Sequence, residues 1–226
     1  KPFVNGVLRT IAREIGKLEL PSREEDEVRY LSVKYSMPEY LVEKWKAAYG
    51  VKTTEKILED FLTERPITVR CRTHKASLKE IVTSLKAQGV TVQQAPYLPY
   101  ALKISDYNHI LTLDAFLQGK ILVQDISSML VAEAASPKKG DYIIDMCAAP
   151  GGKSIHAADK MGDYGNVDAR DVSQYKADLI KENIHRTGVI NVDAKVQDAT
   201  VYDPDSEQAA DIVIADVPCS GYGVIG

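Results

Sequence analysis

The sequence predicts an α/β protein in which a doubly wound parallel sheet follows a small α+β module and a helical N-terminal segment. Apolar, strand-like runs alternate with helical patterns from Gln124 onward, which is typical of a parallel sheet. One of these runs, at 142–146, enters a loop of small residues that opens the next helix. Proline and glycine divide the earlier part of the chain into shorter elements. We therefore expect domains at 1–64, 65–104 and 105–226.

The first 64 residues have the apolar spacing of successive helices. Residues 3–15 repeat apolar side chains at helical spacing, and two further helices are expected at 24–35 and 38–49. Thr53 or Thr54 is expected to cap a fourth helix. Because the chain starts inside the first helix without a methionine or a cap, we expect it to be a piece of a longer protein.

Residues 67–94 predict a compact β-α-β unit. Residues 67–71 alternate like a strand, and residues 90–94 form the expected returning strand. Ser77 and Glu80 have the spacing of a capping box, so a helix is expected between the two strands. A unit of this size suits an RNA-facing module, and a plain spacer is the alternative.

Basic side chains gather on this small unit, although the net charge of the chain is −4. That overall charge argues only weakly against a nucleic-acid partner, because a local basic face can bind phosphates. A solvated helix face is the alternative explanation. The basic residues of the segment, opposed there only by Glu80, are Arg65, Arg70, Arg72, Lys75, Lys79 and Lys86.

Composition limits the class of protein. The chain is 45% hydrophobic and 27% charged, and no apolar run approaches the roughly 20 residues of a membrane span. Residues 1–15 carry charges throughout and do not resemble a secretory signal. Three widely spaced cysteines predict no disulfide framework and a reducing, cytoplasmic location. We expect no membrane partner and no metal site, and the sequence leaves the oligomeric state open.

The second half of the chain alternates helices and strands. The expected helices are at 124–135, 153–160 and 174–187, and the expected strands at 142–146, 167–171, 193–196 and 211–215. In a parallel sheet the carboxyl ends of the strands meet at one edge, where ligands bind.

The loop after the first of these strands reads Cys147-Ala148-Ala149-Pro150-Gly151-Gly152-Lys153. Small residues let the backbone approach a ligand, and glycine permits positive φ. The spacing excludes the Gly-x-Gly-x-x-Gly dinucleotide fingerprint. It also excludes a phosphate-binding P-loop, because Cys147 stands where that motif requires its first glycine. An ordinary tight turn would explain the glycines but not the whole septet.

Aspartates follow three successive strands. Asp171 is placed to accept the ribose hydroxyls of a nucleoside cofactor. Asp198 is placed to meet an adenine amino group, and Asp216 follows the last expected strand. A single aspartate after a strand is usually a turn residue, but three at one edge favour a nucleoside site. Asp168 and Asp203 are expected to be surface or turn residues.

A second signature, Asp216-Val217-Pro218-Cys219-Ser220-Gly221, carries the candidate catalytic residues. Methylation of cytosine at C5 requires a thiolate that adds at C6, which makes C5 nucleophilic. It also requires an acidic group that holds the amino and N3 edge of the base. Asp216 and Cys219 fit these two needs, and a buried structural thiol is the alternative for Cys219.

Together the two signatures resemble the RNA 5-methylcytosine methyltransferases of the NOL/NSUN/Sun class. Gln124-Asp125-x-Ser127-Ser128 matches the same family, and residues 3–9 resemble the closing helix of the NusB-like domain that precedes its bacterial ribosomal RNA enzymes. The resemblance implies a Rossmann-like class I methyltransferase sheet, incomplete at its C-terminal end, with S-adenosylmethionine as donor, S-adenosylhomocysteine as product and 16S ribosomal RNA as partner. The implied cofactor contacts are Cys147, Ala148, Ala149, Pro150, Gly151, Gly152, Lys153, Asp171, Asp198 and Asp216.

The resemblance also changes the expected role of Cys219. In this family the cysteine of a later Thr-Cys motif is the nucleophile and the Pro-Cys cysteine assists product release, so we expect the nucleophile beyond residue 226. DNA cytosine-5 enzymes attack with their Pro-Cys cysteine, and chemistry alone would therefore select Cys219. The alternatives are transfer RNA as substrate, or an RNA-binding or ribosome-assembly module with a vestigial methyltransferase fold.

Overall fold

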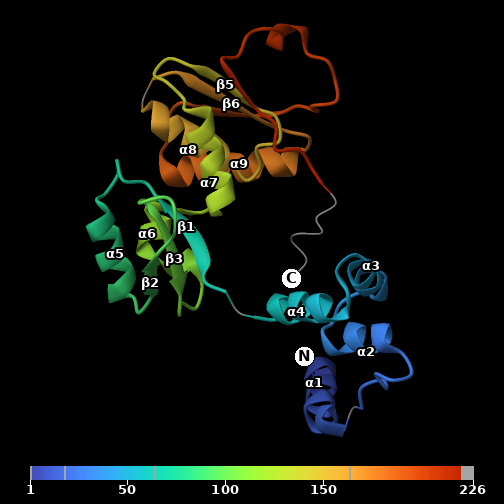
Figure 1. Ribbon diagram of the computed structural model, residues 1–226. Helices are drawn as coiled ribbons and strands as arrows, with labels where there is room; N and C mark the ends of the chain where they lie inside the picture. The colour runs from blue at the N-terminus through green and yellow to red at the C-terminus, as the bar shows by residue number, and fades with distance from the viewer. Residues whose placement is uncertain (1, 18, 64, 163, 220–226) are drawn as a thin grey trace. The chain divides into compact units, whose positions relative to one another are not determined.

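The computed structural model describes residues 2–17, 19–63, 65–162 and 164–219, which form two compact units divided at about residue 64. The first unit is helical and consists of α1 (Pro2–Glu14), η1 (Ile15–Lys17), α2 (Glu27–Lys34), α3 (Glu39–Tyr49) and α4 (Val51–Phe61) (Figure 1). Leu31, Leu41 and Leu58 form its buried centre. The apolar stripe of α1 is instead exposed, as Phe3 shows with an exposed fraction of 81%.

The predicted threonine cap of the fourth helix is wrong. α4 begins at Val51, directly after Gly50, whose φ of 74° ends α3. The Gly50 carbonyl accepts the Thr54 N–H at 3.0 Å, so one glycine serves both helices. Thr54 is consequently buried inside α4.

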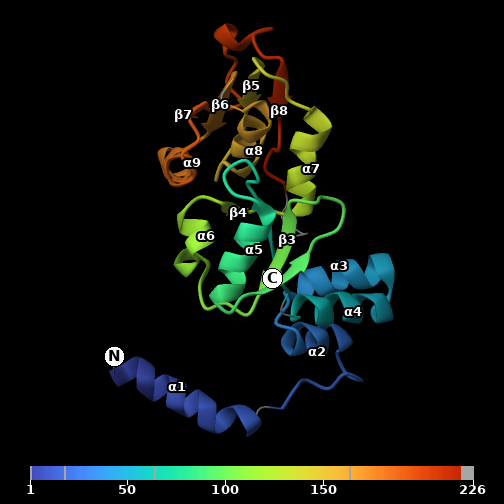
Figure 2. The same ribbon diagram turned by 90° about the vertical axis from the view of Figure 1, so that its left-hand side faces the viewer.

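The second unit begins with an antiparallel sheet in the order β2-β3-β1-β4. Its elements are β1 (Ile67–Cys71), α5 (Leu78–Ala87), β2 (Thr91–Gln94), β3 (Ala101–Ser105), η2 (Ile110–Thr112), α6 (Asp114–Leu117) and β4 (Ile121–Val123). Ser77 and Glu80 make the predicted capping box: the Ser77 hydroxyl accepts the Glu80 N–H, and the Glu80 carboxylate accepts the Ser77 N–H. α5 and α6 lie on one face of this sheet (Figure 2), around the buried Ile81 and Leu85.

This small sheet is larger than the predicted β-α-β unit. β1 and β2 are both antiparallel to β3, which lies between them, so they do not pair with each other. β4 pairs with the other edge of β1, although residues 121–123 lie beyond the expected boundary at 104. The sequence missed β3 and β4 because β3 follows two closely spaced prolines and β4 has only three residues.

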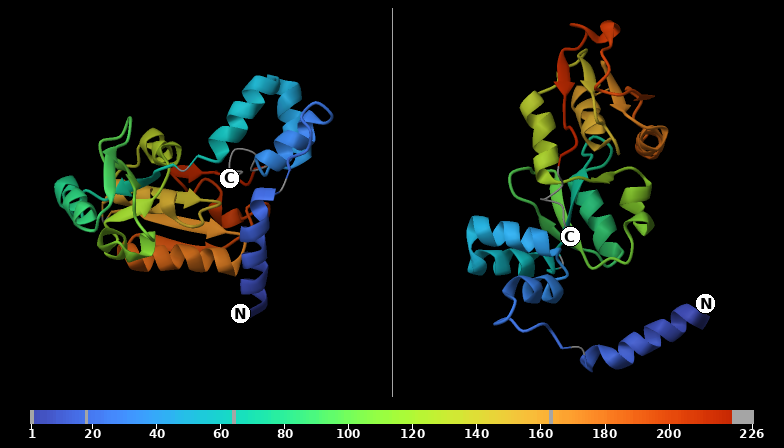
Figure 3. Two further views of the ribbon diagram at one scale, coloured as in Figure 1. Left: turned by 90° about the horizontal axis from the view of Figure 1, so that it is seen from below. Right: turned by 90° about the vertical axis from the view of Figure 1, so that its right-hand side faces the viewer.

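The second sheet of this unit is parallel and has the order β7-β6-β5-β8. Its strands run in one direction (Figure 3, left). The elements are α7 (Ile126–Ala135), β5 (Tyr142–Asp145), α8 (Gly152–Met161), β6 (Asn166–Asp171), α9 (Gln174–Thr187), β7 (Val192–Val196), η3 (Pro204–Ser206) and β8 (Ile212–Ile214). The predicted parallel α/β sheet is therefore confirmed, strand by strand.

The two faces of the parallel sheet differ in chemistry. α7, α8 and α9 cover one face, where Ile143, Val167 and Ile180 belong to the apolar core (Figure 1). The register places Asp168 on the opposite face. Its carboxylate accepts from Arg170 at 2.6 Å and from Lys195 at 3.1 Å. The expectation of a surface or turn position for Asp168 is wrong, because it lies mid-strand and is buried.

Candidate functional site

The loop between β5 and α8 is fixed at its β5 end by hydrogen bonds to the two neighbouring strands, β8 and β6. The Met146 N–H donates to the Ile214 carbonyl at 2.9 Å, and the Ala148 N–H donates to the Arg170 carbonyl at 2.8 Å. Gly151 has a φ of 99°, a conformation that favours glycine. The side chain of Asn183 on α9 donates to the Pro150 carbonyl at 2.9 Å. The loop thus has a defined conformation at the carboxyl ends of the strands, and hydrogen bonds to β6, β8 and α9 hold it there.

Asp171 supports this loop from the end of β6. Its carboxylate accepts the Ala149 N–H at 3.0 Å and the Val172 N–H at 2.8 Å, and it pairs with Lys176 at 3.0 Å. Burial alone would raise the pKa of Asp171, but these hydrogen bonds and the Lys176 charge outweigh it and lower the pKa. A buried, ionised carboxylate therefore lies beside the loop.

The two signatures meet in one ion pair. Lys153 Nζ, in the first turn of α8, lies 2.5 Å from Asp216 Oδ2, just after β8. The Lys153 side chain is 20% exposed and that of Asp216 57% exposed. Since these residues are 63 positions apart, only the parallel arrangement of β5 and β8 brings them together. Ser220 and Gly221 of the second signature lie outside the described residues.

Asp198 lies at the same sheet edge but is not joined to the others by a direct contact. It is exposed, and its Oδ1 accepts the N–H and hydroxyl of Thr200 at 2.9 and 2.7 Å. With Met146 and Ala199 it lines a cavity of about 290 Å³ that extends onto the polar face of the sheet. Asp203, expected to be a turn residue, does make a turn there and also accepts from Arg170.

The cysteines differ in environment. Burial, together with the Asp171 and Asp145 charges, raises the pKa of Cys147, so its thiol is not activated as a nucleophile. Burial raises the pKa of Cys71 to about 12. Cys219 is exposed. Within the described residues, Cys219 therefore does not pack as a buried structural thiol.

The sequence missed Asp145 and Ser154 as part of the site. Asp145 ends β5 and is 1% exposed, and Ser154 donates a hydrogen bond of 2.6 Å to it from the first turn of α8. This contact joins the end of the strand to the start of the helix across the loop. In the sequence, the signal for Asp145 was a carboxylate at the end of an otherwise apolar strand.

The predicted basic face requires a correction. Arg70 and Arg72 are buried, each about 2% exposed, and both pair with Asp159 of α8. Guanidinium groups buried to this degree and paired with Asp159 cannot contact the phosphates of an RNA. The other four basic residues of the segment, Arg65, Lys75, Lys79 and Lys86, are exposed.

Two family models match the chain, one for 16S rRNA methyltransferase RsmB/F over residues 132–226 and one for an RsmF/B-like ferredoxin-like domain over residues 37–110. The probable ribosomal RNA small subunit methyltransferase B of Bacillus subtilis (strain 168) is 39% identical over 226 residues, which are 99% of this chain and 49% of that protein. The chain belongs to the RsmB/F family. The resemblance predicted from the two signatures is thereby confirmed, and the family is one of S-adenosylmethionine-dependent methyltransferases.

Similarity to RsmB/F relatives extends to eukaryotic proteins and to solved structures. The human 28S rRNA (cytosine(4447)-C(5))-methyltransferase is 30% identical over 86% of this chain and 24% of that protein. The crystal structure of PH0851 superposes with a TM-score of 0.83 at 31% identity, over 98% of this chain and 50% of that chain. A methyltransferase homolog from Pyrococcus horikoshii gives 0.71 at 26% identity, over 88% and 65%.

The chain spans about half the length of the curated bacterial RsmB/F relatives it matches. Within the residues that the structure describes, no helix has the length and apolarity to cross a membrane. The same residues contain no group of three or more His, Cys, Asp or Glu side chains arranged to hold a metal ion.

Proposed function

We propose that this chain holds the donor side of an enzyme that transfers a methyl group from S-adenosylmethionine to C5 of a cytosine in small-subunit ribosomal RNA. The observation that carries the proposal is the Lys153–Asp216 ion pair, which joins the loop signature to the Asp-x-Pro-Cys signature at one sheet edge. The RsmB-like relatives are named for small-subunit ribosomal RNA, which supports that RNA over transfer RNA.

The loop and its carboxylates fit a nucleoside-bearing cofactor. A carboxylate has about four lone-pair sites, and three on Asp171 are already used by Ala149, Val172 and Lys176. Its ribose contact would therefore use the remaining site and compete with the half-buried Lys176. We assign the adenine amino group to Asp198 and the rest of the cofactor to residues 147–153. When bound, S-adenosylmethionine supplies an electrophilic methyl group.

We assign the base side to Asp216 and Cys219. Asp216 would hold the amino and N3 edge of the cytosine, and its pairing with Lys153 keeps that carboxylate at the cofactor loop. In such a reaction a cysteine thiolate would add to C6, and C5 would then take the methyl group as its bond to the donor sulfur breaks and S-adenosylhomocysteine leaves. C5 would next lose its proton to a base, and the C6–S bond would break to release the thiolate. We propose that a cysteine outside these 226 residues forms that bond, and that Cys219 assists its release.

Calorimetric titration with S-adenosylmethionine tests the cofactor site. We expect micromolar-range binding to the 226-residue chain and at least tenfold weaker binding to Asp171→Ala, because the loop loses its anchor at Ala149. Asp178→Ala, on the exposed side of α9, is the matched control and should bind like the wild type. A folded wild-type sample that gives no binding heat would favour the vestigial alternative.

Methylation assays separate the remaining alternatives. We expect the whole protein to methylate 16S ribosomal RNA and not transfer RNA, and the 226-residue chain alone to methylate neither. Turnover by the chain alone would overturn the assignment of the nucleophile elsewhere and would select Cys219. We also place the protein in the cytoplasm, a proposal that rests on its free cysteines, which suit a reducing compartment.

A further inference from the structure

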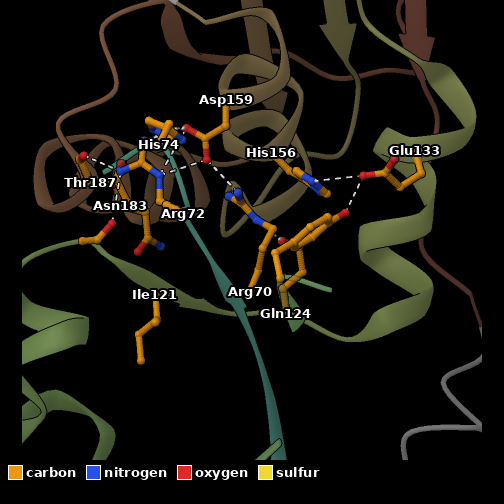
Figure 4. A network of polar contacts seen from close by, with 12 residues as sticks. Arg70, Arg72, His74, Ile121, Gln124, Glu133, His156, Asp159, Asn183 and Thr187 are labelled. Carbon is orange, nitrogen blue, oxygen red and sulfur yellow. Dashed lines mark hydrogen bonds and ion pairs between the residues drawn. The ribbon is translucent and has the colours of Figure 1, made fainter. Parts of the chain in front are cut away.

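The seam between the small antiparallel sheet and the parallel sheet is built around one buried carboxylate. Asp159 of α8 accepts hydrogen bonds from both arginines (Figure 4). Its Oδ2 accepts from Arg70 Nη1 at 2.6 Å and from Arg72 Nε at 2.9 Å, and its Oδ1 accepts from Arg72 Nη2 at 2.6 Å. Arg70 lies in β1 and Arg72 directly follows the strand, two residues further on, so both side chains project toward the same face of the small sheet. Burial alone would raise the pKa of Asp159, but the two guanidinium groups outweigh it and lower the pKa.

At the same seam the backbone of the small module at Gly119 lies against the backbone at the end of α9. Arg72 Nη1 donates to the Thr187 carbonyl at 2.6 Å on α9 and to the Gly119 carbonyl at 3.1 Å in the small module. A Cβ placed on Gly119 would lie 2.5 Å from the Arg186 carbonyl oxygen, so that position admits no side chain. In the opposite direction Arg186 donates to the Phe116 carbonyl at 2.8 Å and its guanidinium lies 3.9 Å from the centre of the Phe116 ring.

The helices that carry this seam also carry the candidate cofactor loop. α8 starts at the loop with Gly152 and holds Asp159 two turns later. α9 holds the loop through Asn183, which donates to the Pro150 carbonyl, and Arg186 Nη2 donates to Asn183 Oδ1 at 2.7 Å. Any rotation of the small module would therefore have to break contacts that lead directly to the loop.

We propose that Arg72, Asp159 and Arg186 are positioning residues that lock the ferredoxin-like module to the cofactor loop, so that RNA held by the module meets the methyl donor at a fixed place. A buried ion pair gives little net stability over apolar packing, but its forked hydrogen bonds are directional. Lysine cannot reproduce the guanidinium fork. The role of RNA in this proposal rests on the proposed function. The rigid connection between the two modules can be measured on this chain without RNA.

Distance measurements between the two modules test the lock. Spin labels are introduced as unnatural amino acids at two exposed positions, Ala87 on α5 and Glu182 on α9, which leaves the native cysteines in place. We expect a narrow distance distribution in the wild type and a broader one in Arg72→Lys. If Arg72→Lys fails to fold, Arg186→Lys replaces it, because this substitution removes fewer buried hydrogen bonds. The same broadening of the distance distribution is expected. A distribution as narrow as that of the wild type in the folded variant would overturn the proposal.

Asp159→Asn should broaden the distance distribution as Arg72→Lys does. Asp168→Asn is its matched control, because Asp168 is also a buried carboxylate paired with an arginine, but within the parallel sheet. It should lower the melting temperature as Asp159→Asn does and leave the distance distribution narrow. Equal broadening in this control would show that the seam residues have only a structural role.

A kinetic split completes the test. In the whole protein Arg72→Lys should lower kcat for RNA methylation at least tenfold while the Kd for S-adenosylmethionine stays within about threefold, since a shift of ~1 Å can cost about 100-fold in rate. An unchanged kcat would overturn the proposal. If the wild type binds no S-adenosylmethionine, the proposed function fails, but the distance measurement still decides whether the modules are locked.

Discussion

Two adjacent glycines of the cofactor loop should respond in opposite ways to alanine. Gly151 has φ 99° and ψ 4°, and a Cβ there would lie 3.3 Å from Ile180 Cγ2 and 3.6 Å from Ile155 Cδ1. Gly152 begins α8 without positive φ, and the nearest atom to its Cβ, Gln124 Cδ, is 3.8 Å away. The two positions therefore differ in backbone conformation and in space.

The cost of Gly151→Ala follows from that geometry. Holding a non-glycine residue at this φ costs on the order of 1–3 kcal/mol. The tight approach to Ile180 adds to the cost, because both residues belong to packed elements. If the free loop relaxes to relieve the strain, binding must restore its shape, and affinity for S-adenosylmethionine falls by roughly 5- to 150-fold. Gly152→Ala, in a helical position, should change stability by no more than about 1 kcal/mol, in the stabilising direction.

Calorimetric titration and thermal unfolding of both variants measure the two effects separately. A loss of 1–3 kcal/mol would lower the melting temperature by roughly 2–12 °C in a chain of this size. If Gly151→Ala binds S-adenosylmethionine as tightly as Gly152→Ala and unfolds at the same temperature, the shape of the loop does not depend on the positive φ. The reasoning would then be refuted for this site.

Two further predictions concern buried titratable groups near the seam and the loop. Burial raises the pKa of Asp145 to about 6, against the hydrogen bond from Ser154, so its contribution to stability is present below pH ~4 and lost as the pH rises through about 6. Asp145→Asn should remove that dependence and raise the free energy of unfolding at pH 8 by up to roughly 3 kcal/mol, measured by urea unfolding without cofactor; an unchanged pH profile would contradict it. Burial, then the Arg70 charge, lowers the pKa of His156 to about 3, so its NMR ring-proton shifts should stay constant between pH 5 and 8. A midpoint in that range would show that the ring reaches solvent.

Local signals predicted the elements of the parallel sheet well. The strands and helices after residue 124 appear in the expected order, because each has enough residues to show its own periodicity. The capping box of Ser77 and Glu80 was equally predictable, since both partners lie within one turn. β4 was missed because three residues carry no period, and the Thr54 cap was wrong because Gly50 already serves that helix.

The candidate site was predictable to the extent that strand ends share an edge. That rule placed three aspartates at the carboxyl ends of parallel strands, where the structure has them: Asp171 is the last residue of β6, and Asp198 and Asp216 each lie two residues beyond the end of β7 and β8. The rule did not predict which contacts these three aspartates make. Asp171 binds the loop backbone directly, while Asp198 only closes its own turn with Thr200.

By itself the sequence determined the family, through two motifs whose residues are specific to a chemistry, and the alternation that makes a parallel sheet. Only the tertiary structure decided how charges are used. Arg70 and Arg72 look like RNA-binding cations in the sequence, yet their partner Asp159 lies 89 and 87 positions away. Lys153 and Asp216 are likewise distant in sequence. A charge is exposed or buried according to which elements pack over it, and that packing depends on the whole chain rather than on neighbouring residues.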